Sequence, residues 1–225
     1  MKQLDELIDK KDEMWQLIQE WATKSGHKNE ILPVNFDNAQ KVILKLQVST
    51  KSALGAVAYK TGGILVDNRW LRILGSGHER FSRNIISWNK IDILEGSPKM
   101  KGCLLIADDV LGGFFAINGG GIQGEMGNVF YFAPDTLEWE DMEMGYTDFI
   151  HWAMAGDVAK FYEGLRWNEW KNEVLNINCD QGILIYPFLW AEGSEITNRA
   201  RKAVPIDELW NINLMNKEKI SRQSD

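Results

Sequence analysis

The segment that most constrains the fold is residues 102–142, in which short apolar runs alternate with turn-forming residues. Three of these runs, at 104–107, 113–117 and 128–132, are bounded by Gly, Asn, Asp or Pro. Such runs are typical of buried strands joined by short connections. A fourth run, at 137–141, alternates apolar and acidic residues. The segment therefore predicts four strands at the centre of a mostly antiparallel sheet.

Helical patterns stand before and after these strands. Residues 3–22 repeat apolar side chains at helical spacing. Capping residues and glycine stops predict further helices at 38–48, at 52–59 and within 148–163. Because the helices do not alternate with the strands, we expect an α+β fold whose sheet packs against the N-terminal and 148–163 helices. Residues 85–94 and 182–190 predict further strands. Residues 205–214 fit a helix and a strand equally well, and 216–225 are expected to be frayed.

The length of 225 residues fits one domain with an extension or two small domains. We expect an α+β domain at 1–175 and a C-terminal extension, 176–225, packed on it. The N-terminus has no signal-peptide pattern, and no apolar run is long enough to span a membrane. Cys103 and Cys179 are far apart in the sequence, which favours free thiols in a reducing compartment. The expected location is the cytoplasm.

The negative charge is concentrated in one part of the chain. The net charge is -7, but residues 102–163 contain one Lys and eleven Asp or Glu. An acidic segment argues against nucleic acid as a ligand and favours a basic protein partner. The alternative is a solvated acidic surface that only keeps the protein soluble. The candidate binding residues are five carboxylates with the start of a glycine-rich loop: Asp135, Glu138, Glu140, Asp141, Glu143, Asn118, Gly119 and Gly120.

Two pairs of residues raise the alternative of an enzyme. Glu138 and Glu140 lie two residues apart, so they share one face of a strand, as a hydrolase or isomerase with paired carboxylates would need. Ser76 is flanked by glycines and lies two residues from His78, which suggests a nucleophile and its base, but no GxSxG motif is present. An exposed acidic edge strand and a polar loop are the commoner explanations. Only convergence of either pair in a pocket would favour catalysis.

No cofactor or metal is predicted. Residues 119–124 match GxGxxG, but a strand follows them instead of the helix whose N-terminus would hold a pyrophosphate. Their glycines predict a hairpin connection. The histidines and cysteines lack zinc-type spacing. A carbohydrate-binding module, the third functional class, would need several exposed tryptophans, whereas helical spacing predicts core positions for Trp15, Trp21, Trp167 and Trp170.

Four strings carry a resemblance to a known family: VLGGFFAINGGG at 110–121, GNVFYFAPDTLEWEDM at 127–142, DFIHWAMAGDVAKFYEGLRW at 148–167 and DQGILIYPFLWAEG at 180–193. They resemble a bacterial family known as domain of unknown function 2625. More distantly, the order of elements is similar to the SUKH superfamily of yeast cell-wall regulators and bacterial immunity proteins. That resemblance implies a SUKH-like fold and a non-catalytic, immunity-type protein that binds a toxin, often a nuclease. The chain departs from the superfamily by extending past its last helix.

Overall fold

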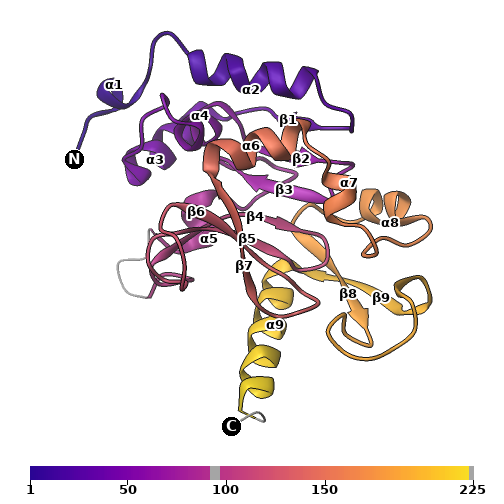
Figure 1. The fold of residues 1–225 in the computed structure, drawn as a ribbon. Coiled ribbons are helices and arrows are strands. Elements are labelled where there is room, and N and C mark those ends of the chain that lie inside the picture. Colours follow the sequence, from indigo (N-terminus) through magenta and orange to yellow (C-terminus); the bar gives the residue numbers. More distant parts are fainter. Residues whose placement is uncertain (92–96, 223–225) are drawn as a thin grey trace.

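The computed structural model describes residues 1–91 and 97–222 (Figure 1). These residues form a seven-stranded sheet in which each strand pairs antiparallel with the one before it in the chain. The strands, in sheet order, are β1 (Glu30–Leu32), β2 (Gly63–Val66), β3 (Leu71–Leu74), β4 (Cys103–Asp109), β5 (Phe114–Asn118), β6 (Asn128–Phe132) and β7 (Trp139–Gly145). The predicted α+β fold with a mostly antiparallel sheet is confirmed.

The strands predicted in the 102–142 segment are all present, with one difference in position. β4, β5 and β6 overlap the predicted runs at 104–107, 113–117 and 128–132, and pairs such as Phe114 with Phe132 set their register. The strand predicted at 137–141 begins at Trp139 and forms the edge of the sheet instead of its centre. Its exposed acidic side chains suit an edge position, where one side of the strand faces solvent.

Both faces of the sheet are covered, because adjacent strand residues point to opposite sides. Phe115 contacts the ring of Phe149 with centroids 5.1 Å apart, on the face covered by α6 (Tyr146–Ala155). Phe114 instead meets the ring of Trp210 at 4.8 Å, on the face covered by α9 (Ile206–Ser221). The two consecutive phenylalanines of β5 therefore pack into two separate layers of the core, one on each face of the sheet.

The N-terminal helices pack together with α6 above the sheet (Figure 1). They are α1 (Leu4–Leu7), α2 (Glu13–Thr23), α3 (Phe36–Leu46) and α4 (Ala53–Lys60). The predicted single helix over 3–22 is wrong in one respect, because the chain leaves the helix between α1 and α2. There the Leu7 carbonyl accepts the Thr50 amide at 2.8 Å, and the Thr50 hydroxyl accepts the Asp9 amide at 2.6 Å. These tertiary hydrogen bonds replace the ones that a continuous helix would make.

The strand predicted at 85–94 is wrong over its first part. Residues Ile85–Asn89 form helix α5, because the Asn84 side chain accepts the amides of Ile86 and Ser87, both at 2.9 Å. An Asn at this position is a strong N-cap, and it overrides the β-branched sequence that follows. Residues 92–94 of the predicted strand lie outside the described residues.

The C-terminal part contains α7 (Val158–Phe161), α8 (Trp170–Asn176) and a separate antiparallel pair formed by β8 (Gln181–Tyr186) and β9 (Ala200–Pro205). A short 3-10 helix, η1 (Ile196–Asn198), precedes β9. The predicted strand at 182–190 ends earlier, at a cis Tyr186–Pro187 peptide. Of residues 205–214, Pro205 ends β9 and the rest belong to α9. This helix continues to Ser221, so the expected fraying from 216 is wrong up to that residue.

The extension contacts the main sheet directly. The Ile183 amide donates to the Val110 carbonyl at 2.6 Å, and the Asn213 side chain donates to the Gly112 carbonyl at 2.9 Å. Both contacts lie at the β4–β5 connection. The division into a domain at 1–175 and an extension at 176–225 stays a prediction.

Candidate functional site

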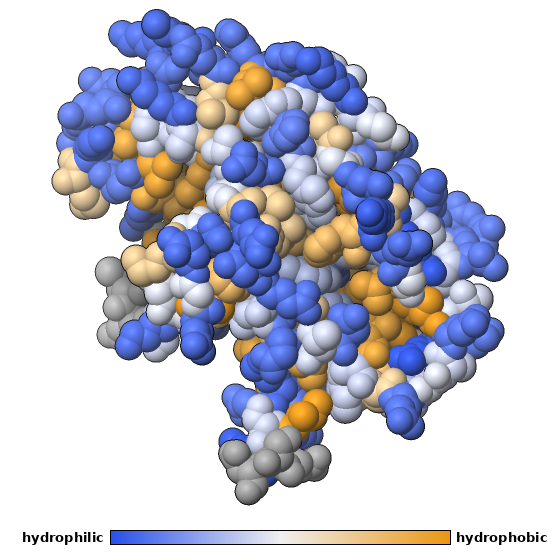
Figure 2. All heavy atoms as spheres, viewed as in Figure 1, coloured by the Kyte–Doolittle hydropathy of each residue, from blue (hydrophilic) through white to orange (hydrophobic). Residues whose placement is uncertain are grey.

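Five exposed carboxylates lie on β7 and on the connection that leads into it from β6. They are Asp135, Glu138, Glu140, Asp141 and Glu143, called here the acidic edge. β7 pairs with β6 on one side only, so its other side carries no strand partner among the described residues. Figure 2 shows hydrophilic residues over the front of the molecule, where β7 runs in Figure 1.

The acidic edge is only partly neutralised by its neighbours. Glu138 forms an ion pair with Lys217 of α9. Glu140 accepts a hydrogen bond from the Thr136 hydroxyl at 3.1 Å, and Asp141 accepts one from the Asn128 side chain at 3.0 Å. Among the described residues, Glu138 is the only member with a cationic partner. The remaining four carboxylates are available to a partner outside the chain.

The glycine-rich loop predicted beside these residues is a β5–β6 hairpin connection, as expected. Asn118 is buried and organises the loop: its side-chain oxygen accepts the Gly120 amide at 2.9 Å, and its nitrogen donates to the Ile122 carbonyl at 2.9 Å. Gly119 and Gly120 are exposed. The end of the loop reaches the acidic edge, because Asn128 pairs with Gly145 and contacts Asp141. Asn118 therefore shapes the loop, while its neighbours face solvent.

The residue pairs considered for catalysis do not make the required contacts. The hydroxyl of the buried Ser76 donates to the Thr61 carbonyl at 2.7 Å, although Ser76 and His78 both border one depression of about 480 Å³. Nδ1 of His78 accepts the Arg80 amide at 3.1 Å. Glu138 and Glu140 lie on the exposed acidic edge. The Ser76 hydroxyl and Nδ1 of His78 are thus directed to other partners instead of to each other.

The tryptophans do not form a surface platform for a sugar. Each of the ten side chains is buried or half-buried. Trp70, for example, is fully buried and contacts Trp167 and Trp170, with ring centroids 5.8 and 5.0 Å away. The predicted core positions of Trp15, Trp21, Trp167 and Trp170 agree with this arrangement, although Trp167 precedes its helix instead of lying in it.

A buried ionic network is the main feature that the sequence did not predict. Asp108 on β4 accepts Arg72 on one carboxylate oxygen and Arg83 on the other, both at 2.5 Å. Arg83 also pairs with Asp180 at 3.0 Å. Burial alone would lower the pKa of Arg83, but the charges and hydrogen bonds of Asp108 and Asp180 outweigh it and raise that pKa. The sequence sign of this network is a charged residue within an otherwise apolar run, at Arg72 and again at Asp108.

Asp109, beside this network, is buried and accepts three hydrogen bonds. One oxygen takes the amides of Leu111 and Gly113, both at 2.9 Å, and the other takes the Tyr131 hydroxyl at 2.8 Å. Burial nevertheless raises the pKa of the Asp109 carboxyl. These contacts hold the β4–β5 turn against β6, which is a structural role.

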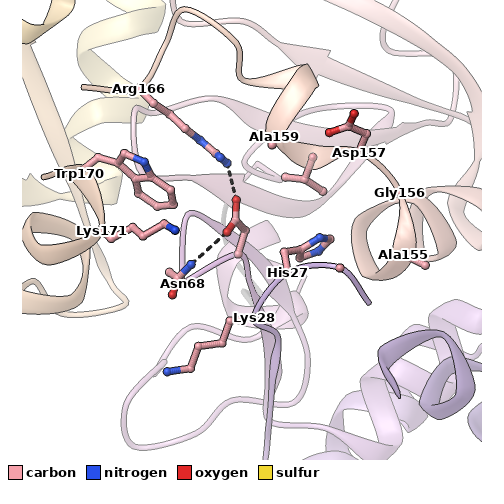
Figure 3. Close-up of a pocket in the computed structure, with 13 residues that line it drawn as sticks. His27, Lys28, Asn68, Ala155, Gly156, Asp157, Ala159, Arg166, Trp170 and Lys171 are labelled. Atoms are coloured by element: carbon pink, nitrogen blue, oxygen red, sulfur yellow. Dashed lines mark hydrogen bonds and ion pairs between the residues drawn. The ribbon is translucent and has the colours of Figure 1, made fainter. Parts of the chain in front are cut away.

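A basic pocket of about 640 Å³ opens on a different part of the surface (Figure 3). Its wall is formed by four segments: residues 26–28 after α2, the β2–β3 turn at 67–68, the α6–α7 corner at 155–159, and residues 166–171 at the start of α8. Its charged side chains are three cations and two carboxylates: Lys28, Arg166, Lys171, Asp67 and Asp157. None of the pocket residues is among the site residues predicted from the sequence.

Two negative results concern the described residues. They contain no group of three or more His, Cys, Asp and Glu side chains arranged to hold a metal ion. None of the helices within 1–91 and 97–222 has the length and apolar character needed to cross a bilayer.

The fold and surface define an α+β protein with an antiparallel seven-stranded sheet, a negatively charged edge and a separate basic pocket. The chain belongs to the family described as "Protein of unknown function DUF2625", whose sequence profile matches residues 4–209. The resemblance to this family is thereby confirmed. The SUKH-like character of the fold stays a prediction.

Two curated bacterial proteins are similar over nearly their whole length. The protein YbfG of Escherichia coli (strain K12), whose name calls it uncharacterized, is 42% identical over 220 residues, which cover 97% of this chain and 98% of YbfG. An uncharacterized protein of Haemophilus influenzae (strain ATCC 51907 / DSM 11121 / KW20 / Rd) is 33% identical, with coverage of 97% and 96%. No solved structure matched the chain.

Proposed function

We propose that the protein is a non-catalytic binding module whose acidic edge binds a basic protein. The single observation that carries this proposal is the exposure of five carboxylates on the edge strand β7 and the connection that leads into it, of which only Glu138 has a cationic partner among the described residues. Like charges held close together repel one another, and a cationic partner relieves that repulsion and speeds the encounter.

The more specific proposal is an immunity-type role in the cytoplasm, in which the basic partner is a nuclease toxin. A nuclease is basic where it holds nucleic acid, so an acidic edge can occupy that groove. The distant SUKH resemblance supports the same role. Both cysteines are free, which agrees with a reducing compartment.

The edge position of β7 also favours binding over self-association. An edge strand exposes unpaired backbone groups, and charged side chains on it prevent pairing with another copy of the same strand. A basic partner meets no such repulsion. The acidic edge therefore discriminates by charge, which is how natural interfaces reject wrong partners.

The test is charge reversal on the acidic edge. Glu140→Lys with Glu143→Lys is the chosen pair, because Glu138 is already paired with Lys217 and its reversal would disturb α9. The matched control is Glu192→Lys with Glu195→Lys, two exposed residues outside the edge with the same change in net charge. Partners captured from the native bacterium at low salt would be identified, purified and titrated against all three proteins.

We expect a basic partner that binds the wild-type and control proteins and loses at least tenfold in affinity for Glu140→Lys/Glu143→Lys. Raising the salt should weaken wild-type binding, since exposed charges are screened over about 10 Å at 0.1 M. Unchanged binding by Glu140→Lys/Glu143→Lys would contradict the proposal. The immunity role requires in addition that the partner be a nuclease inhibited by the wild-type protein.

A further inference from the structure

The basic pocket of Figure 3 lies apart from the acidic edge, and its wall contains an arginine, Arg166, whose side chain is held in place by its neighbours. Arg166 pairs with the buried Asp67 at 2.6 Å. Its guanidinium lies over the rings of Trp70, Tyr162 and Trp170, with centroid distances of 5.0, 5.6 and 4.5 Å. An arginine held by aromatic rings loses little freedom when it binds a ligand, because its orientation is already set.

The carboxylates of the pocket are occupied by groups of the protein. Asp67 accepts Arg166 on one oxygen and the Asn68 side chain on the other, at 2.6 and 3.1 Å. Asp157 accepts the Lys160 amide at 2.9 Å and caps α7. Asp67 is therefore balanced by Arg166, whereas Asp157 keeps its negative charge, because a backbone amide carries none. Two further cations border the pocket, so that its cations outnumber its carboxylates.

Lys28 and Lys171 are those cations. Both are exposed and border the pocket from different segments, and neither has an ion-pair partner among the described residues. The Lys171 ammonium lies 5.5 Å from the centre of the Trp170 ring, so it stays beside the indole at the pocket wall. The three cations and two carboxylates of the pocket together leave a net charge of +1 around one cavity.

We propose that this pocket binds the phosphate monoester of a small organic molecule. A phosphate monoester carries nearly two negative charges at pH 7 and three strong acceptor oxygens, which match two lysines and a nearby guanidinium. A carboxylate has only two acceptor oxygens for the same three cationic groups. The volume of about 640 Å³ lies in the range of small-molecule sites and exceeds what a bare phosphate fills. Trp170 provides an aromatic surface for the organic part.

This inference is independent of the proposed function, because the pocket and the acidic edge share no residue. The lysines are suitable for mutation, since they are exposed and make no ion pair that supports the fold. Replacement of Arg166 is not suitable, because it would leave Asp67 buried without its cation. The test variant is therefore Lys28→Gln/Lys171→Gln. The matched control is Lys202→Gln/Lys219→Gln, which removes two exposed lysines elsewhere.

The experiment is a titration of the full-length ¹⁵N-labelled protein with phenyl phosphate at low ionic strength, followed by NMR. We expect the Lys28 and Asn68 amides and the Trp170 indole N–H to shift together in a saturable way. Lys28→Gln/Lys171→Gln should bind at least tenfold more weakly, while Lys202→Gln/Lys219→Gln should bind as the wild type does. Circular dichroism of both variants checks that the fold is retained.

Parallel titrations with inorganic phosphate and benzoate identify the recognised group. Phenyl phosphate should bind most tightly, and benzoate at least tenfold more weakly. Benzoate binding as tight as phenyl phosphate would overturn the phosphate assignment. The site itself would be overturned by the absence of saturable shifts at Lys28 and Trp170, or by equal weakening in the two lysine pairs, because the latter would indicate non-specific charge attraction.

Discussion

Asp109 shows how one buried carboxyl is tolerated at the β4–β5 turn. Its two oxygens accept the amides of Leu111 and Gly113 and the hydroxyl of Tyr131. Burial still raises its pKa, so the folded protein retains a proton at pH values where the unfolded chain has lost it. Stability is therefore expected to fall as the pH rises from the ordinary range of an aspartate towards the raised pKa of Asp109.

Replacement of Asp109 by Asn tests whether this carboxyl makes stability fall as the pH rises. The amide oxygen of Asn still accepts the two backbone amides, and the Tyr131 hydroxyl can accept from its nitrogen. We expect the stability of Asp109→Asn to fall less as the pH rises than that of the wild type, as measured by urea unfolding between pH 4 and 8. A wild type that gains more stability than Asp109→Asn as the pH rises over this range would contradict the expected sign.

Replacement of Asp109 by Ala removes the acceptor altogether. Asp109→Ala should lower the free energy of unfolding by about 3 kcal/mol or more, because several buried groups lose their partner. The same urea unfolding experiment measures this loss.

At the scale of elements, α4 packs unusually close to the segment before it. A Cβ at Gly55 would lie 2.1 Å from the Ser49 carbonyl oxygen, which is a backbone atom that cannot move aside easily. Gly55 lies inside α4, where glycine normally costs roughly 1 kcal/mol relative to alanine. The close contact between α4 and the 49–50 turn therefore outweighs helix propensity.

We predict that Gly55→Ala destabilises the protein by about 1–3 kcal/mol, the usual cost of overpacking, although the same change stabilises most helices. The control is Gly145→Ala, because Gly145 has a φ of -80° and no heavy atom within 4 Å of an added Cβ. This control should change stability little. Thermal unfolding of both variants measures the difference, and a stabilised Gly55→Ala would disprove the tight packing.

At the scale of the whole molecule, the C-terminal part completes contacts that begin in the main sheet. Asp180 pairs with Arg83, and the Gln181 carbonyl accepts Arg72, so the buried ionic network spans both parts. Trp210 of α9 covers Phe114 on one face of the sheet. The extension therefore supplies both ionic partners and apolar cover to the main sheet.

Removal of residues 176–225 should consequently abolish cooperative unfolding of the remaining chain. Arg83 would lose Asp180, and an unbalanced buried charge typically costs about 3–5 kcal/mol, a large part of the stability of a domain. Calorimetry and near-ultraviolet circular dichroism of residues 1–175 would measure the effect. A fragment that unfolds cooperatively within a few degrees of the full chain would show that the domain does not need the extension.

Local patterns alone predicted much of the fold. The apolar runs between turn residues predicted β4, β5 and β6. A capping residue at 37 predicted α3, and a small apolar run ended by Gly62 and Gly63 predicted α4, because these signals depend on neighbouring residues. The same patterns did not predict helix α5 at Ile85–Asn89, which begins at the Asn84 cap. They also did not predict the break between α1 and α2, where Thr50 hydrogen-bonds to the Leu7 carbonyl. The acidic edge was also visible in the sequence, because all five carboxylates lie within nine residues.

The buried ionic network and the basic pocket could be recognised only from the tertiary structure. Arg83 and Asp180 are 97 residues apart, and Arg166 and Asp67 are 99 apart, so no local spacing indicates that they meet. The pocket joins four segments that have no shared motif. Sequence periodicity determines which face of an element is apolar, but the partner of a charged side chain depends on how distant elements pack.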